Sequence, residues 1–115
     1  MKSFQERVSH DDRVQLVQEI RARYPDRIPI ICEPKQGSDI VIDKVKFLAP
    51  ADFKMGHFIV TLRKRIKKMR ASDAIYVFCN NVVAPSAMCV GEIYEKHKSD
   101  DGLLYLQFDK ESTFG

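Results

Sequence analysis

The chain has 115 residues, the size of a single domain that can bury a stable core without disulfides or metal. Its composition, 44% hydrophobic and 30% charged with 5 Gly and 5 Pro, excludes the disordered and collagen-like classes, and its net charge of +3 is too small to indicate a nucleic-acid-binding protein. The sequence has no signal peptide, no bilayer-length apolar run and no CxxC pair, so we expect a cytosolic domain with reduced thiols.

The first predicted element is a helix that begins after Ser9 and ends before Pro25. Ser9 with Asp12 three residues later is a start signal related to the capping box, and proline cannot continue the pattern. The apolar residues at helical spacing are Val14, Val17, Ile20 and Tyr24. A shorter helical piece is expected before Ser9, so residues 1–24 form a predicted N-terminal helical extension.

Two strands are predicted next. Residues 28–33 are a β-branched run. In residues 44–49 one face of the predicted strand carries Lys44, Lys46 and Leu48, and the other face carries Val45, Phe47 and Ala49. Lysines of this kind are typical of a sheet edge protected from aggregation. An edge also offers unpaired backbone groups to an extended peptide. The residues alone leave both interpretations open, a protected edge and a peptide-binding edge.

The clearest amphipathic helix is predicted in the middle of the chain, after a break at Pro50 and with Asp52 as its expected cap. Its apolar positions are Met55, Phe58, Ile59, Leu62 and Ile66. Six of the eight residues at 63–70 are cationic. We interpret this run as the solvated end of the helix, where cations complement the helix dipole. A surface for anionic lipid, an acidic partner or nucleic acid remains open, although no base-reading motif accompanies the run.

The next predicted strand, at 75–79, is apolar on both faces, so we expect it to be central. A short helix capped by Ser86 follows and ends at His97. The last strand, at 103–108, comes after the Asp101-Gly102 turn. This element order predicts an α+β fold, a ubiquitin-like β-grasp with two N-terminal helices. We assign residues 25–108 to the β-grasp core and residues 109–115 to a flexible C-terminal conjugation tail.

No arrangement of residues indicates catalysis. The three cysteines, Cys32, Cys79 and Cys89, are interpreted as small buried hydrophobes, and no histidine pair has metal-ligand spacing. We therefore predict no catalytic residue, no metal, no cofactor and no enzyme. The terminal Gly115 is more informative, because a residue without Cβ can thread a narrow enzyme channel and present an unhindered acyl group. On a β-grasp this ending indicates a protein modifier.

Seven short stretches then point to one family. They are RIPIICE at 27–33, SDIVIDK at 38–44, KFLAPAD at 46–52, RKRI at 63–66, IYEKHK at 93–98, DGLLY at 101–105 and STFG at 112–115. From about Arg27 to Gly115 the chain resembles the lipid-conjugated ubiquitin-like modifiers of autophagy, the family of the GABA-receptor-associated protein and microtubule-associated protein light chain 3.

The resemblance implies a mechanism. Activating and conjugating enzymes would carry Gly115 as a thioester, and the final acceptor would be phosphatidylethanolamine. A deconjugating cysteine protease would return the domain from the autophagosome membrane to the cytoplasm. Gly115 is already last, so we expect no trimming step. Nucleic acid is not an expected partner. The alternative is an unconjugated peptide- or microtubule-binding adaptor of the same fold.

The resemblance also implies two pockets for receptor peptides that carry an aromatic residue and, three positions later, an aliphatic one. The first pocket would use Ile20, Pro29, Ile31, Lys46, Leu48 and Leu103. The second pocket would use Phe47, Ala49, Pro50, Phe53, Phe58, Thr61, Leu62 and Arg65. The backbone of 46–48 would pair with the peptide. Leu16 stands where many members carry an acid, and Ala49 and Thr61 replace bulkier aliphatic residues, so we expect a wider second pocket and a shifted peptide preference.

Overall fold

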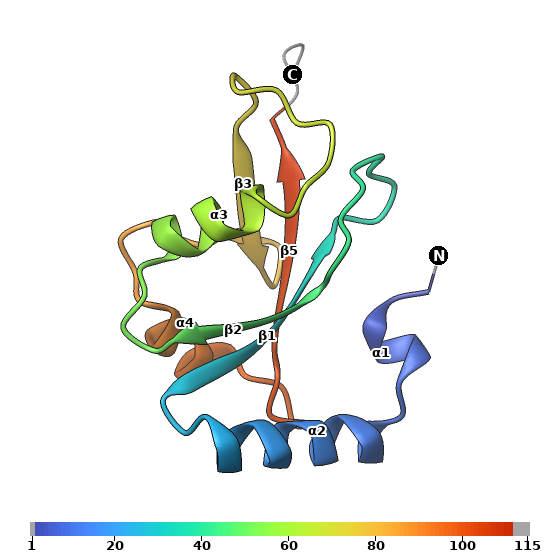
Figure 1. Ribbon diagram of the computed structural model, residues 1–115, viewed down its shortest axis with the longest axis vertical. Helices are drawn as coiled ribbons and strands as arrows, with labels where there is room; N and C mark the ends of the chain where they lie inside the picture. Colours follow the sequence, from blue (N-terminus) through green and yellow to red (C-terminus); the bar gives the residue numbers. More distant parts are fainter. Residues whose placement is uncertain (1, 112–115) are drawn as a thin grey trace.

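A mixed sheet runs through the part of the molecule that the computed structural model describes, residues 2–111, with its five strands in the order β2-β1-β5-β3-β4 (Figure 1). The central strand β5 is parallel to β1 and antiparallel to β3, and the two outer pairs are antiparallel. The strands are β1 (Arg27–Pro34), β2 (Lys46–Pro50), β3 (Ile75–Cys79), β4 (Val82–Val83) and β5 (Leu104–Lys110). The predicted α+β ubiquitin-like class is confirmed.

Helices cover both faces of this sheet. Their bounds are α1 (Phe4–Arg7), α2 (His10–Arg23), α3 (Met55–Arg63) and α4 (Val90–His97). The apolar sides of α3 and α4 pack on one face in the main core, whereas α1 and α2 pack on the other face in a smaller core around Phe4, Val17, Ile31 and Leu103. Neighbouring residues of β1 therefore serve different cores, Ile30 the main one and Ile31 the smaller one, as strand alternation requires.

The two N-terminal helices form as their capping signals predict. The Ser9 hydroxyl accepts a hydrogen bond from the backbone N–H of Asp12 at 3.2 Å, and α2 ends directly before Tyr24 and Pro25. Ser3 and Glu6 form a capping box at the start of α1. Hydrogen bonds from Ser3 lower the pKa of the Glu6 carboxyl. Local sequence therefore starts both helices.

A buried polar cluster fastens α2 to the sheet. The Asp101 side chain has no exposed surface, and its carboxylate accepts hydrogen bonds from Arg13 Nη1 at 2.5 Å, the Tyr105 hydroxyl at 2.6 Å and the Leu103 N–H at 2.8 Å. Burial alone would raise the pKa of Asp101, but these donors outweigh it and lower the pKa. We call Arg13, Asp101 and Tyr105 the latch.

The turn that carries Asp101 needs glycine next to it. Gly102 has φ of +89°, and a Cβ there would lie 2.8 Å from Cγ1 of Val17 on α2. Both the left-handed backbone and the close approach of α2 exclude a side chain. The predicted Asp101-Gly102 turn is confirmed, and it also brings α2 against the sheet.

The structure corrects the predicted extent of α3. The helix ends at Arg63, although Ile66 is 9% exposed and still reaches the core from the following loop. The expected cap at Asp52 is also wrong: α3 begins after Lys54, and its first N–H groups, of Met55 and Gly56, donate to carbonyls of the loop before α4. Tertiary contacts thus replace the side-chain cap.

Smaller corrections concern the later elements. α4 starts after Cys89 rather than Ser86. β3 is an interior strand as expected, because it lies between β5 and β4, although β5 occupies the middle of the sheet. Cys89 is partly exposed, whereas Cys32 and Cys79 are buried as expected. β4 was not predicted. β5 runs two residues beyond the expected end at Phe108, because Asp109 and Lys110 pair with β3.

Candidate functional site

Strand β2 forms one edge of the sheet, as predicted from Lys44 and Lys46, although the strand begins at Lys46 rather than at Lys44 and ends at Pro50. Its inner side pairs with β1, with Leu48 opposite Pro29 and Lys46 opposite Ile31. On its other side no strand among residues 2–111 is paired with it. The backbone of 46–48 is therefore placed where an added strand could form ladder hydrogen bonds.

A cavity of about 390 Å³ opens between α2, β1 and β2. All six residues predicted for the first pocket line it: Ile20, Pro29, Ile31, Lys46, Leu48 and Leu103. A volume in this range suits a large side chain or a small ligand. We call this cavity the first pocket.

The walls of the first pocket combine an apolar floor with a cationic rim. Ile31 and Leu103 are each 1% exposed and form the floor, whereas Ile20 and Leu48 remain partly exposed. Every ionisable residue that lines the cavity is basic, namely Arg27, Lys44 and Lys46. The pocket therefore favours an apolar side chain flanked by acidic groups.

Three further lining residues, beyond the six predicted for the first pocket, decide its character. Arg27 and Lys44 complete the cationic rim, and Leu16 of α2 adds apolar surface. The signal for Leu16 was its spacing from Ile20, since residues four apart share one helix face. Because Leu16 lines the wall, it makes that part of the first pocket apolar.

The residues predicted for the second pocket are brought together between β2 and α3, but most of them are packed into the core. Phe47, Phe58 and Leu62 are 8%, 1% and 0% exposed, and the rings of Phe47 and Phe58 meet edge to face at 5.5 Å. Ala49 is buried beside them, Pro50 and Phe53 are partly exposed, and Thr61 and Arg65 are exposed. The buried members of this group therefore fill the space between β2 and α3 with the chain's own side chains.

The predicted conjugation residue, Gly115, lies outside the described residues. The last described residue is Glu111, whose N–H donates to the carbonyl of Ala74 at 2.9 Å. Glu111 therefore lies beside the start of β3.

The cysteines and histidines show no convergent chemistry in the described part of the chain. Burial, with a smaller effect of the neighbouring Glu33, raises the pKa of the Cys32 thiol, and burial raises that of Cys79. Between residues 2 and 111 no three metal-ligating side chains cluster. Within the same range, no helix is both long and apolar enough to span a membrane.

Comparison with known proteins extends this picture. A family described as "Autophagy protein Atg8 ubiquitin like" matches residues 12–115. Autophagy-related protein 8 of Schizosaccharomyces pombe is 45% identical over 113 residues, which cover 97% of this chain and 93% of that protein. The protein of the same name from Dictyostelium discoideum is 44% identical over 106 residues, covering 91% and 87%.

Solved structures agree with the sequence relatives. The crystal structure of Trypanosoma brucei ATG8 superposes with a TM-score of 0.90 at 39% identity and covers 100% of this chain and 99% of that one. Plasmodium falciparum Atg8, solved in complex with a peptide of Plasmodium falciparum Atg3, gives a TM-score of 0.84 at 32% identity and covers 97% and 98%. The chain therefore belongs to the Atg8 family of ubiquitin-like autophagy proteins.

Proposed function

We propose that this chain is a modifier that is conjugated through Gly115 to phosphatidylethanolamine on autophagosomal membranes and there recruits receptors. The observation that carries the proposal is that the family match runs through residue 115 and so includes the Ser112-Thr113-Phe114-Gly115 ending. In the unconjugated state the domain resides in the cytoplasm.

Conjugation proceeds by acyl transfer. On the activating enzyme the Gly115 carboxylate attacks the α-phosphorus of ATP, which forms an acyl adenylate and releases pyrophosphate. An enzyme cysteine thiolate then attacks the acyl carbon and displaces AMP to form a thioester. After transfer to the conjugating enzyme, the amine of phosphatidylethanolamine attacks the thioester carbonyl and the thiolate leaves, which forms an amide. Two acyl chains then anchor the domain firmly, since each buried CH₂ contributes about 0.8 kcal/mol. A cysteine protease reverses the step by hydrolysing the amide.

Receptor peptides bind along β2. The first pocket takes the aromatic side chain, the backbone of 46–48 extends the sheet, and the basic rim favours acidic residues beside the aromatic one. The second pocket takes the aliphatic residue after β2 and α3 separate. The relative from Plasmodium falciparum was solved with an Atg3 peptide, and we assign a peptide of the conjugating enzyme to the same surface of this chain.

Reconstitution with activating enzyme, conjugating enzyme, ATP and phosphatidylethanolamine liposomes tests the proposal. The wild-type chain forms a conjugate of higher mass, and Gly115→Ala forms none while it binds a receptor peptide with unchanged affinity. Absence of a conjugate under conditions that conjugate a known family member, together with retained peptide binding, would favour the unconjugated peptide- or microtubule-binding adaptor. Equal conjugation of Gly115→Ala would contradict the role of Gly115.

A further inference from the structure

The basic run at 63–70 divides into an inward part and an outward part. The Arg63 guanidinium donates hydrogen bonds to three carbonyls of the loop that follows α3, those of Arg70, Ala71 and Asp73. Arg70 lies 3.7 Å from the Asp73 carboxylate. Arg63 and Arg70 therefore hold the loop closed, and their charges are engaged within the chain.

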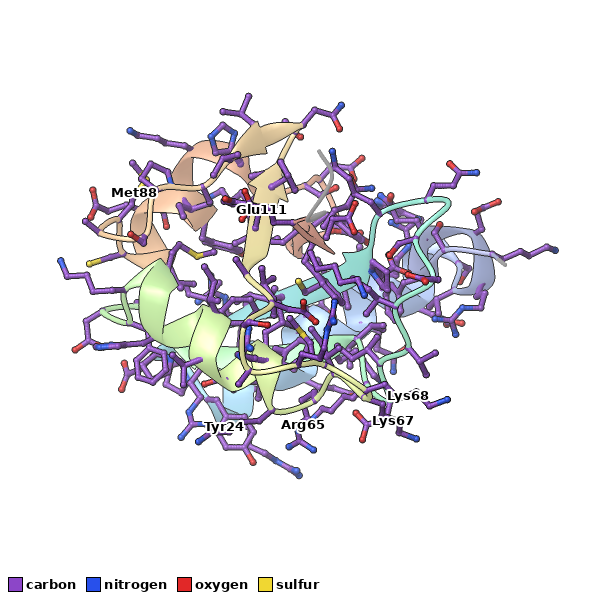
Figure 2. All side chains as sticks on the ribbon, turned by 90° about the horizontal axis from the view of Figure 1, so that it is seen from above. Tyr24, Arg65, Lys67, Lys68, Met88 and Glu111 are labelled. Carbon is purple, nitrogen blue, oxygen red and sulfur yellow. The ribbon has the colours of Figure 1, made fainter. Side chains whose placement is uncertain are left out.

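The other cations of the run face solvent. Lys64, Arg65, Lys67 and Lys68 are exposed, and none has a carboxylate within salt-bridge distance among residues 2–111. We call these four residues the basic loop. Ile66 is buried between them, and the Lys67 N–H donates to the Val41 carbonyl, so the loop is anchored. Figure 2 shows Arg65, Lys67 and Lys68 along one border of the molecule with their side chains directed outward.

The basic loop lies at the same end of the molecule as Glu111, the last described residue. The Asp73 N–H donates to the Arg70 carbonyl at 3.0 Å, and the Glu111 N–H donates to the carbonyl of the adjacent Ala74. Figure 1 shows the loop between α3 and β3 and the end of β5 in the same upper part of the view, and α2 at the opposite end. The four residues from 112 to 115 span at most about 14 Å when extended.

We propose that the basic loop is a membrane-contact surface that binds anionic phospholipid headgroups and turns this end of the domain toward the bilayer. The orienting role rests on the proposed conjugation at Gly115, whereas headgroup binding does not. Four unpaired cations within a few residues match the size of the basic clusters that recognise anionic lipids near membranes. Residues 63–73 contain no aromatic side chain on which a base could stack, which disfavours nucleic acid as the partner.

This orientation has a consequence for the receptor site. The first pocket has one wall on α2, at the end of the molecule opposite to the basic loop in Figure 1. A domain held by its basic loop therefore keeps the first pocket open to the aqueous side, where receptor peptides approach. The basic loop and the first pocket share no residue, so contact with lipid leaves the first pocket free for a peptide, whereas Arg65 belongs to both the basic loop and the predicted second pocket.

Vesicle binding of the full unconjugated chain tests headgroup binding. The K67Q/K68Q variant is compared with K54Q/K96Q as a control. The control removes the same charge from two other exposed lysines, Lys54 directly before α3 and Lys96 within α4. Each lysine at an anionic surface strengthens binding about fivefold, so K67Q/K68Q should weaken binding to vesicles with 30% phosphatidylserine by at least about tenfold, and K54Q/K96Q by less than about threefold. Raising the salt from 0.05 M to 0.5 M should abolish binding. Equal losses in the two variants, salt-independent binding, or tighter binding to duplex RNA of equal phosphate concentration would overturn the proposal.

A chemical tether tests the orientation without any conjugation enzyme. Gly115→Cys is coupled to a maleimide lipid in a Cys89→Ser background, because Cys89 is partly exposed. On anionic vesicles Lys67 and Lys68 should react more slowly with an amine-acetylating reagent than on neutral vesicles, while Lys54 and Lys96 react equally on both. Equal reactivity of all four lysines on the two vesicle types would contradict the orientation. Failure of enzymatic conjugation would leave both tests unaffected.

Discussion

The two groups of residues predicted to bind peptide lie on opposite sides of β2 and differ in one respect: the first surrounds a cavity, whereas the second fills its own space. Alternation along the strand divides them, since Lys46 and Leu48 face the first pocket while Phe47 and Ala49 face α3. On the side of β2 that faces α2 there is an open cavity, whereas on the side that faces α3 the rings of Phe47 and Phe58 are already in contact. Peptide binding should therefore depend mainly on the preformed pocket, because opening the second one costs free energy.

The largest expected loss of stability comes from a substitution in the second group, which is packed between β2 and α3. Phe58→Ala removes a ring that is 1% exposed and leaves a cavity in the main core, so the free energy of unfolding should fall by about 3–5 kcal/mol. Denaturant unfolding measures it. A loss below about 1 kcal/mol would show that α3 and β2 are already loosely packed and that the second pocket is open in solution.

The latch supports the first pocket, because it holds α2 in place as one wall of that pocket. Asp101→Ala leaves the Leu103 N–H and the Tyr105 hydroxyl without their buried acceptor, and we expect a loss of about 2–3 kcal/mol in unfolding free energy. Peptide affinity should fall as well, since α2 loses its anchor. Unchanged hydrogen exchange in α2 of this variant would contradict the role of the latch.

A half-buried side chain of the first pocket should separate binding from stability. Leu48→Ala removes apolar surface from the cavity, and we expect peptide affinity to fall about tenfold while unfolding free energy changes by about 1 kcal/mol or less. Calorimetric titration with an aromatic-x-x-aliphatic peptide measures the first quantity. An unchanged affinity would remove the first pocket from the receptor site.

Acid should weaken the latch. The pKa of Asp101 is lowered in the folded state from its ordinary value of 3.8, so its stabilising effect is present above about pH 4 and is lost as the pH falls through the lowered folded pKa. Unfolding free energy measured between pH 5 and pH 2 should fall more steeply for the wild-type chain than for Asp101→Ala. Parallel curves for the two proteins would show that Asp101 titrates normally.

The smallest effect is expected at the surface of the second pocket. Thr61 is exposed on α3, and its hydroxyl donates only to the His57 carbonyl one turn earlier. Thr61→Ala should change unfolding free energy by less than about 0.5 kcal/mol and leave peptide affinity unchanged. A tenfold loss of affinity would show that the exposed surface of α3 contributes to peptide binding as much as the first pocket does.

The sequence predicted the elements that local signals control. Ser9 starts α2 and Pro25 follows its end, and the two lysines of the predicted strand at 44–49 indicated an edge strand correctly. The resemblance then supplied six residues that do surround one cavity. Their common location depends on the sheet order, which periodicity alone does not contain, so the resemblance was needed for this step.

Tertiary contacts overruled local signals elsewhere. Ile66 continues the helical spacing of α3, yet it enters the core from a loop that the Arg63 side chain closes through carbonyls seven and eight residues later. β4 was missed because two residues carry no periodicity. Its signal was the Asn80-Asn81 pair, where φ of 52° and 66° suits a tight hairpin turn. The closed second pocket could not be predicted, since packing density is not visible in the sequence.

The central claim, conjugation of Gly115 to phospholipid, is tested most directly by mass spectrometry of the C-terminal peptide from membranes of starved cells. We predict a peptide whose Gly115 carboxyl is joined by an amide to phosphatidylethanolamine, with both acyl chains present. A membrane-bound pool in which every C-terminal peptide carries a free Gly115 carboxylate would contradict the account.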